Sequence, residues 1–442
     1  MASRPRKGFA WAAVLREDPA ILSDLRAWKD AARFADGKRY LAWEEFRRRP
    51  LPAQHEPEHL WALVQLQRLG SSTALPLDGL EGSTVRVVVT DPLRAALHRI
   101  DCHQGLVDAG LRKGDSDAET YARRAFIEEA LASSRIEGAD TVRVVGRELL
   151  RSGRPPRDRS ERMIVNNFAA LQHLDQWSRD PLTPQMLCHI QEILTRDTLD
   201  DSQDSGTIRR DDKVRVRDRL TGEIVHVPPP ASELERRLKR LCDFANAPAQ
   251  DESFLHPVVR AILLHYQIAM DHPFGDGNGR TARWVFMWYL VKQDAFWWCR
   301  YLPVSRMTER ARQGYYQAFV HAAADGFDAT YLVRQQVRCM ELEMANLAAL
   351  LGRRRALYEH ARRRLRLEDE FNIRQLALFD HAVRHADAEF TQTGHAAFHG
   401  VTAMTAGRDL NALVALGCLR QERRGRKIVY RPTQHLLRLA EN

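Results

Sequence analysis

The stretch from His272 to Arg283, HPFGDGNGRTAR, places a base, a carboxylate, three glycines and two arginines close together in the chain. Its glycines, at positions 275, 277 and 279, allow unusual backbone angles and the close approach of a ligand. The apolar run over 284–291 predicts a helix directly after the motif. Because the first N–H groups of a helix bind anions, this stretch predicts a phosphate site at a helix start.

Each charged residue of the motif has a role in such a site. Arg280 and Arg283 would add positive charge from the first helical turn, beside the backbone N–H groups of residues 277–279. Asp276 would bind Mg²⁺, which takes one or two carboxylates beside the phosphates it bridges. His272 then remains as the proton acceptor, a role that contributes roughly a hundredfold to ten-thousandfold in rate. An isolated GDGNG, in contrast, is more often an ordinary turn.

The full string resembles the Fic family motif, HxFx(D/E)GNGRxxR, with every specified position present. The resemblance implies a helical Fic core that transfers AMP from ATP to a Ser, Thr or Tyr hydroxyl of a protein. It implies that His272 is the base and Asp276 the Mg²⁺ ligand. Asn278 and neighbouring N–H groups would form the α-phosphate anion hole. The full predicted nucleotide-binding set is Phe274 (as a core anchor), Gly275, Gly277, Asn278, Gly279, Arg280, Arg283, Tyr316 and Phe319.

The residue at position 279 bears on which group is transferred. Phosphorylating relatives of the Doc type carry a lysine where this chain has Gly279. The resemblance therefore favours transfer of AMP over transfer of phosphate.

A second segment, Ser133-Ser134-Arg135-Ile136-Glu137-Gly138, follows a helical pattern that begins near residue 117. Taken alone, it is a helix end with a solvated glutamate and a glycine C-cap. Beside the Fic motif it resembles the family's inhibitory signature, (S/T)xxxE(G/N), with Ser133, Glu137 and Gly138 in register. The resemblance implies that Glu137 pairs with Arg283 and misplaces the triphosphate. The same glutamate could position a water that removes AMP from a modified target.

Residues 206–230 predict a β-hairpin between these two motifs. Strands are expected over 213–217 and 223–227, with a turn at Thr221-Gly222 and a stop at prolines 228–230. A strand edge can bind a target peptide through its backbone, and the family has such a flap. A surface hairpin without a partner is the alternative.

Two further features flank the motif. Asp271 stands where the family more often has an apolar residue; it could orient His272 or contact solvent. Tyr316 and Phe319 lie on a predicted helix similar to one that borders the family's adenine pocket, although a tyrosine pair at 315–316 is more often part of a core.

The C-terminal residues predict a small winged helix after a charged helix with arginines at 353–355 and 362–364. Helices are expected over 371–385, 394–399 and 402–416, and a wing over 419–430. Thr402, Thr405, Arg408 and Asn411 would face outward and reach DNA bases, with wing cations such as Arg424 and Arg426 on phosphates. Asp409 on the same helix would oppose DNA binding, and a protein partner is the alternative.

Composition is consistent with an enzyme that carries extra modules. The 442 residues predict several domains, and 67 basic against 58 acidic side chains give a net charge of +9, too mild to indicate nucleic acid by itself. Six widely spaced cysteines without metal-ligand spacing indicate reduced thiols in a cytoplasmic protein. No run reaches transmembrane length.

We therefore predict a mainly α-helical protein with an N-terminal accessory region over 1–115, a catalytic domain over 116–345 and a winged helix over 355–442. Its predicted function is that of a self-inhibited protein adenylyltransferase that uses ATP and Mg²⁺. A DNA-binding regulator that uses the Fic core as a nucleotide sensor, an interaction scaffold and a homodimer remain open. Residues 1–115 could also be a packing extension of the catalytic core.

Overall fold

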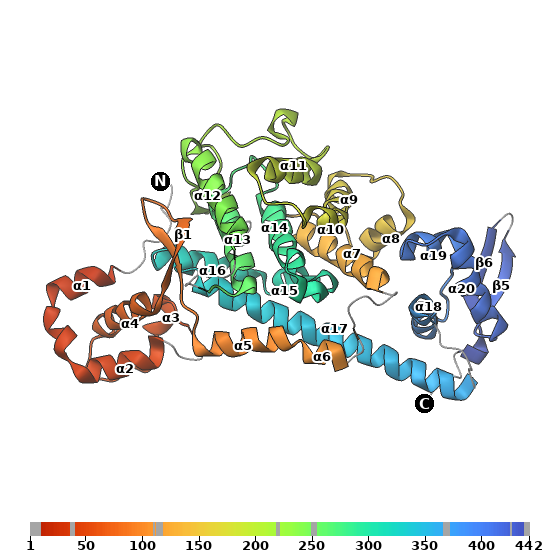
Figure 1. The fold of residues 1–442 in the computed structure, drawn as a ribbon, viewed down its shortest axis with the longest axis horizontal. Coiled ribbons are helices and arrows are strands. Elements are labelled where there is room, and N and C mark those ends of the chain that lie inside the picture. Colours follow the sequence, from red (N-terminus) through yellow and green to blue (C-terminus); the bar gives the residue numbers. More distant parts are fainter. Residues whose placement is uncertain are drawn as a thin grey trace. The chain divides into compact units, whose positions relative to one another are not determined.

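The computed structural model describes residues 10–35, 40–108, 111, 118–217, 222–248, 254–365, 372–424 and 427–436. They are mainly α-helical, as predicted, with three small antiparallel two-stranded sheets (Figure 1). The chain folds into two compact units. One comprises residues 1–102, 172–296 and 307–341, and the other comprises 103–171, 297–306 and 342–442. The predicted domain limits stay predictions.

The first unit begins with helices that pack around an apolar cluster containing Phe46, Leu60 and Trp61. Pro57 opens the longest of these helices, a position where its missing N–H costs nothing. The elements are α1 (Trp11–Glu17), η1 (Pro19–Ser23), α2 (Leu25–Ala35), α3 (Trp43–Phe46), α4 (Pro57–Ser71), β1 (Thr73–Asp78), β2 (Thr84–Val87) and α5 (Asp91–Cys102). Strand β2 ends at Val87, and the N–H of the following Val88 donates to the hydroxyl of Thr330.

The rest of the first unit holds the motif. Helices α13 (Pro257–Asp271) and α14 (Asn278–Lys292) pack together along their lengths and are buried on almost every face (Figure 1). Around them lie α10 (Leu174–Trp177), α11 (Pro184–Thr195), η2 (Ser202–Asp204), β3 (Val216–Arg217), β4 (Ile224–His226), η3 (Ala231–Glu233), α12 (Leu234–Asn246), α16 (Arg312–Ala324) and the start of α17 (Thr330–Leu365). Two segments have residues in both units: η4 (Asp294–Tyr301) and α15 (Val304–Arg310).

The flap hairpin is shorter than predicted. Only Val216–His226 and Arg217–Ile224 pair, with an irregularity between them, and Thr221 of the predicted turn lies outside the described residues. The preceding residues bond locally instead: the Lys213 N–H donates to the Asp211 carboxylate, and the Arg215 guanidinium donates to the Val214 carbonyl. Such local bonds compete with strand pairing.

The second unit contains the predicted inhibitory helix and the C-terminal elements. It comprises α6 (Gln104–Asp108), α7 (Ala118–Ile136), α8 (Arg143–Ser152), α9 (Arg159–Gln172), the remainder of α17, α18 (Ile373–Arg384), α19 (Gln392–His399), α20 (Ala403–Ala415), β5 (Leu419–Arg424) and β6 (Lys427–Pro432). Helix α19 packs against α7 and α8, where the Arg151 guanidinium lies over the Phe398 ring.

The C-terminal elements occur in the order and positions predicted for a winged helix, although the assignment to that class stays a prediction. One residue differs from expectation: Asp409 is buried, not on an outer face. Its carboxylate accepts hydrogen bonds from Asn372 and Arg374 and pairs with His395. Burial opposes ionisation, but these partners lower the pKa of Asp409. Asp409 therefore holds α20 to the start of α18 and to α19, and the outer face of α20 lacks this negative charge.

No helix among the described residues is long and apolar enough to cross a membrane.

Candidate active site

The motif forms a loop between two helices, with a left-handed residue near each end. Helix α13 ends at Asp271, and His272 follows with a φ of 41°. Helix α14 begins at Asn278, directly after Gly277 with a φ of 85°. The left-handed angle costs a non-glycine residue such as His272 about 1–2 kcal/mol, so the surrounding contacts must hold it there.

The imidazole of His272 is oriented by the last turn of α13. Its Nδ1 contacts the carbonyl oxygen of Ala269 at hydrogen-bond distance. Because a carbonyl oxygen only accepts, Nδ1 carries the proton and Nε2 is the acceptor nitrogen of the ring. The ring is partly exposed. In this tautomer Nε2 is the ring nitrogen that a general-base role would use.

The anion cradle combines a helix start with a fastened loop. The side chain of Asn278 makes two hydrogen bonds to the loop backbone. Its amide oxygen accepts from the Phe274 N–H at 2.9 Å, and its amide nitrogen donates to the Phe274 carbonyl at 2.8 Å. The Phe274 ring is fully buried, as expected of a core anchor. Asn278 and Gly279 supply backbone N–H groups to the first turn of α14, where helical bonds do not use them. An anion bound there would meet the positive end of the helix dipole.

Both predicted arginines lie on α14 and are buried. Arg280 donates from Nη1 to the Leu194 carbonyl at 2.7 Å, and its Nη2 lies 3.3 Å from Oδ2 of Asp276. Arg283 lies one helical turn further and is 5% exposed. Arg280 therefore lies against the loop, and Arg283 is buried one turn further along α14; burial strengthens the field of such charges on a bound anion.

Asp276 has an environment that fits a magnesium ligand. Its side chain is 45% exposed, although Oδ1 accepts from the Gly277 N–H at 2.5 Å and Oδ2 faces Arg280. A carboxylate has roughly four lone-pair sites and can therefore accept from several partners at once. Mg²⁺ keeps several waters and needs only one or two such carboxylates beside phosphates.

Gly277 tests the geometry of the cradle. A Cβ at this position would lie 2.8 Å from Cγ2 of Thr195, and the φ of 85° already disfavours a side chain. We expect Gly277→Ala to shift the start of α14 and to lower the AMP transfer that the family resemblance implies by roughly a hundredfold, the cost of a displacement of about an ångström. Gly314→Ala is the matched control, because nothing lies within 4 Å of a Cβ there. Equal rates for the two variants would contradict this geometry.

Two residues of the flap bond to the backbone of the motif or of the residues just before it. Arg209 donates from Nε to the His272 carbonyl at 2.8 Å and from Nη2 to the carbonyl of Pro229, and its own N–H donates to the Pro273 carbonyl at 2.8 Å. His226 of β4 contacts the Met270 carbonyl from Nε2 at 2.6 Å. Burial lowers the pKa of His226 to about 4, so this histidine is neutral at pH 7. The flap therefore holds the segment that carries His272.

Gln191 of α11 joins the same loop from the other side. Its amide nitrogen donates to the Asp276 carbonyl at 3.1 Å, while its amide oxygen accepts from the Gly206 N–H at 2.6 Å. Our sequence interpretation missed this residue, and Gln191 carries no local signal beyond a polar residue on an apolar helix.

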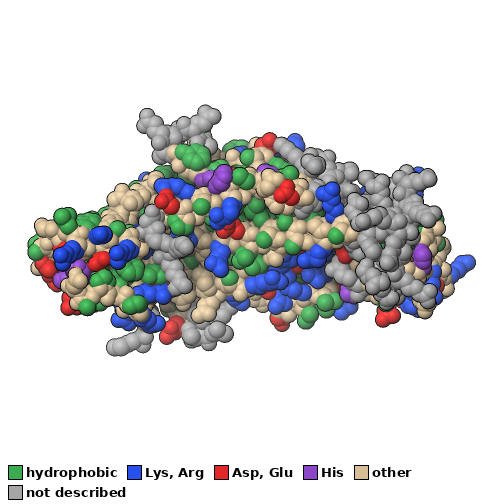
Figure 2. Space-filling view, turned by 90° about the horizontal axis from the view of Figure 1, so that it is seen from below, with side chains coloured by type: hydrophobic (Ala, Val, Ile, Leu, Met, Phe, Trp, Pro, Cys, Tyr) green, Lys and Arg blue, Asp and Glu red, His purple; other side chains and the backbone are tan. Residues whose placement is uncertain are grey.

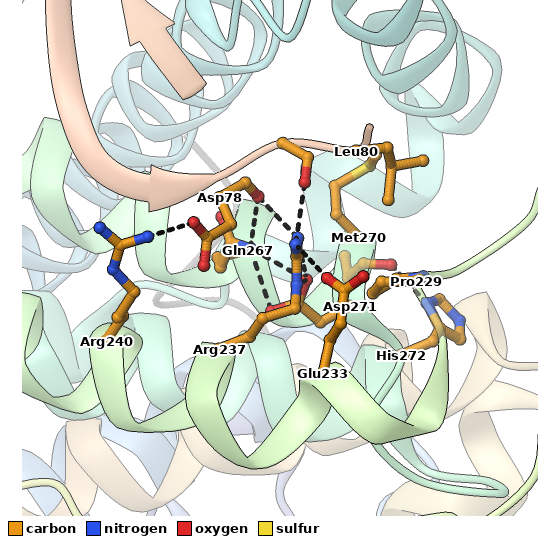
Figure 3. Close-up of polar contacts among 12 residues, drawn as sticks. Asp78, Leu80, Pro229, Glu233, Arg237, Arg240, Gln267, Met270, Asp271 and His272 are labelled. Carbon is orange, nitrogen blue, oxygen red and sulfur yellow. Dashed lines mark hydrogen bonds and ion pairs between the residues drawn. The ribbon is translucent and has the colours of Figure 1, made fainter. Parts of the chain in front are cut away.

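Asp271 does not contact solvent; it is fully buried. Figure 3 shows its carboxylate between Arg237 of α12 and Gln267, beside Asp78. Arg237 was also missed. The pattern did contain a signal, because Arg237 follows Leu234 by three residues and precedes Leu241 by four, which places a charge on the apolar face of α12.

The predicted inhibitory residues lie at the end of α7. Ser133 is buried, Glu137 is partly exposed and Gly138 is exposed with a φ of 101°. The left-handed angle of Gly138 agrees with its predicted role at a helix end. The predicted pairing of Glu137 with Arg283 would join the two units and stays a prediction.

The adenine candidates lie on α16, close to α13. The Phe319 ring stacks on Tyr266 of α13 with centroids 5.6 Å apart, and Tyr316 is 38% exposed with the Arg312 guanidinium over its ring. Tyr315, in contrast, is buried against His265. Tyr316 is therefore the more accessible of the two candidates, whereas Phe319 is largely engaged in packing.

Comparisons with known proteins support the family resemblance. Residues 181–290 match the model of the Fic/DOC family. A relative from Nematostella vectensis named "Protein adenylyltransferase Fic" is 33% identical over 116 residues, which are 26% of this chain and 25% of that protein. A relative of the same name from Culex quinquefasciatus is 27% identical over 289 residues, 64% of this chain and 51% of that protein. The chain thus matches about a quarter and about half of the length of these two relatives.

A solved structure supports the fold. The structure of a Fic family protein from Desulfovibrio desulfuricans G20 covers 76% of this chain and 96% of its own, with a TM-score of 0.52 and 19% identity. At that identity the likeness concerns the fold alone. Together with the motif geometry, the matches lead to one conclusion: residues 181–290 form a Fic/DOC family domain.

Proposed function

We propose that this protein is a protein adenylyltransferase, which transfers AMP from ATP to a Ser, Thr or Tyr hydroxyl of a target protein. One observation carries the proposal: His272, with its Nδ1 on the Ala269 carbonyl, lies in the loop that leads into the N-terminus of α14, whose first two turns carry the buried Arg280 and Arg283. The printed names of the Nematostella and Culex relatives point to the same chemistry.

In this reaction Nε2 of His272 accepts the proton of the target hydroxyl as its oxygen attacks the α-phosphorus. The bond between the α-phosphorus and the bridging oxygen breaks, and pyrophosphate leaves. The N–H groups of Asn278 and Gly279 hold the α-phosphate, while Arg280 stabilises charge on the leaving group. Catalysis then rests on positioning and on a fixed electrostatic field rather than on covalent chemistry by the protein.

Mg²⁺ is the cofactor that this site would use. Asp276 would hold it, and the ion would neutralise part of the charge on the phosphates. Arg280, 3.3 Å from the same carboxylate, would keep Asp276 turned toward the phosphates.

Target binding is proposed for the flap over residues 206–230. The β3–β4 pair is a two-stranded sheet, so each strand has an edge to which a peptide strand can add. Because His226 of β4 contacts the carbonyl of Met270, a peptide on the flap would be held close to the loop that carries His272.

Self-inhibition by Glu137 is the second part of the proposal. A carboxylate paired with Arg283 would remove a partner of the γ-phosphate, and ATP would bind with its α-phosphate out of line. The same carboxylate could orient a water for removal of AMP. Whether AMP addition or AMP removal dominates would then depend on the position of one side chain.

Labelled ATP tests the proposed reaction directly. The Glu137→Gly protein is incubated with Mg²⁺ and either α-³²P-ATP or γ-³²P-ATP, and protein-bound label is measured. Label from the α-phosphate alone is expected. Label from the γ-phosphate would indicate phosphate transfer and would contradict the proposal, as would no label from either nucleotide.

DNA binding by the C-terminal elements is a second candidate function, and the burial of Asp409 favours it. The outer face of α20 carries Thr402, Arg408 and Asn411, all exposed. The wing cations are partly neutralised, since Glu389 pairs with both Arg424 and Arg431. Figure 2 shows one face of the molecule, on which Lys and Arg side chains are drawn in blue. Arg426 lies outside the described residues.

We expect Arg408→Ala to weaken binding to a specific DNA site by about 1–3 kcal/mol, because Arg408 would contact a base edge. Arg424→Ala should weaken binding of all DNA sequences alike. Fluorescence anisotropy over a salt series, with a scrambled duplex as control, measures both effects. Binding that is absent at low salt, or unchanged by either substitution, would reject this candidate.

A further inference from the structure

The residue before the catalytic histidine takes part in a buried charge pair. Arg237 of α12 donates from Nε to Oδ1 of Asp271 at 2.7 Å, and its Nη2 lies 2.7 Å from the same oxygen. The Arg237 and Asp271 side chains are 2% and 0% exposed. Gln267, one turn earlier on α13, donates to both carboxylate oxygens at 2.9 and 3.0 Å. Figure 3 shows these groups converging beside His272.

Arg237 also donates hydrogen bonds to the N-terminal β1–β2 hairpin. Its Nη2 donates to the Asp78 carbonyl at 2.7 Å, and its Nη1 donates to the Gly79 carbonyl at 2.9 Å. Gln267 also donates to the Asp78 carbonyl, at 3.0 Å. Asp78 is the last residue of β1. One guanidinium therefore connects the end of β1 to the last residue of α13 through rigid, nearly water-free contacts.

Stability alone does not account for this arrangement. Moving two charges out of water costs several kcal/mol per ion, and their attraction often does no more than repay it. Burial raises the pKa of Asp271 to about 6, even though Arg237 and Gln267 favour the carboxylate. A well-packed apolar pair would serve packing as well or better. Unlike an apolar pair, the ion pair fixes the orientation of the Asp271 side chain.

The orientation of Asp271 matters because this residue directly precedes the proposed base, His272. His272 has a left-handed backbone and a ring set by the carbonyl of Ala269, within the last turn of α13. Rotation of Asp271 would move both. Arg209 and His226 bond to the carbonyls of His272 and Met270, and Arg237 bonds to the buried side chain of Asp271.

We propose that Arg237 and Asp271 are positioning residues, which fasten the end of α13 to the β1–β2 hairpin and thereby hold His272 in line for proton transfer. This inference rests on the proposed function of His272 as a general base. It also gives the N-terminal region a role, since the tip of its hairpin is one end of the link.

A double substitution tests the link without leaving an unpaired buried charge. Arg237→Met with Asp271→Leu replaces the pair by apolar groups of similar size, a change that is often neutral or stabilising. We expect an unchanged Kd for ATP and a modestly lower melting temperature, because the carbonyls of Asp78 and Gly79 lose their Arg237 donors. The kcat for AMP transfer should fall by about tenfold to a hundredfold, because the base loses its alignment.

Arg236→Met is the matched control. Arg236 is the neighbouring arginine on α12; it also binds Asp78, at 2.8 Å, but from the exposed side and without contact to Asp271. Surface pairs of this kind contribute about 0–1 kcal/mol. The control should therefore match the parent in melting temperature, Kd and kcat.

Three results would overturn the proposal: a parental kcat in the double variant, a loss of kcat that only parallels a loss of folded protein, or an equal loss in Arg236→Met. A parent that transfers no AMP would instead reject the proposed function. In that case ¹⁵N NMR of labelled histidine still tests whether Arg237 and Asp271 orient His272, because it reports the tautomer of the ring. The His272 signal is assigned by comparison with His272→Ala. The parent should show the tautomer protonated at Nδ1, and the double variant a mixture. The same single tautomer in both proteins would overturn the link.

Discussion

His272→Ala is expected to lower AMP transfer by roughly a hundredfold to ten-thousandfold, the contribution of a well-placed general base. The expected loss is in kcat rather than in ATP binding, because the cradle formed by Asn278, Gly279 and Arg280 contains no group from the imidazole. Rates of protein labelling from α-³²P-ATP and equilibrium binding of ATP measure the two quantities separately.

His272→Asn is the matched control for this change. Asparagine tolerates the left-handed backbone angle, and its amide can donate to the Ala269 carbonyl as Nδ1 of the histidine does. It cannot act as a base. The variant should therefore be as inactive as His272→Ala while its melting temperature stays close to that of the parent. Substantial activity in His272→Asn would show that proton abstraction by this side chain is not required.

Glu137→Gly is expected to raise auto-AMPylation by about tenfold to a hundredfold, because a correctly seated triphosphate recovers the alignment that misplacement costs. Glu137→Gln should act in the same direction, since it keeps the shape and removes the charge that would pair with Arg283. Initial rates at saturating ATP compare the variants. The increase should vanish when His272→Ala is added.

Glu148→Gly is the matched control, since it also removes an acidic side chain, from the exposed side of α8 in the same unit. A glycine inside a helix costs about 1 kcal/mol, so this variant reports the effect of a weakened helix. It should leave transfer at the parental rate. Equal activation in Glu148→Gly and Glu137→Gly would mean that loosening of the unit, and not loss of a specific carboxylate, raises activity.

Much of the fold was predictable because the relevant signals are local. The motif itself specifies a loop followed by a helix, and α14 begins at Asn278, within the glycine-rich stretch. The C-terminal helices and hairpin lie close to their predicted positions because turn and capping residues separate them: Thr391 caps α19, Thr402 caps α20, and Gly417 has a φ of 68° after α20.

The contacts that hold the site were not predictable in the same way. Arg209, Gln191 and Arg237 act on the motif from distant parts of the sequence, through backbone carbonyls that leave no trace in the local pattern. Asp409 was misplaced for a related reason. Its helical phase allowed an outer position, but the partners that keep it inside, Arg374 and His395, come from two other helices.

The most direct test of the central claim is the mass of protein targets after incubation with ATP and Mg²⁺. Lysate proteins are treated with the Glu137→Gly form, and peptides are searched by mass spectrometry for AMP on Ser, Thr or Tyr. We expect such adducts on the enzyme and on at least one target, and none with the Glu137→Gly, His272→Ala double variant. Absence of AMP adducts with the single variant, or equal adducts with both, would contradict it.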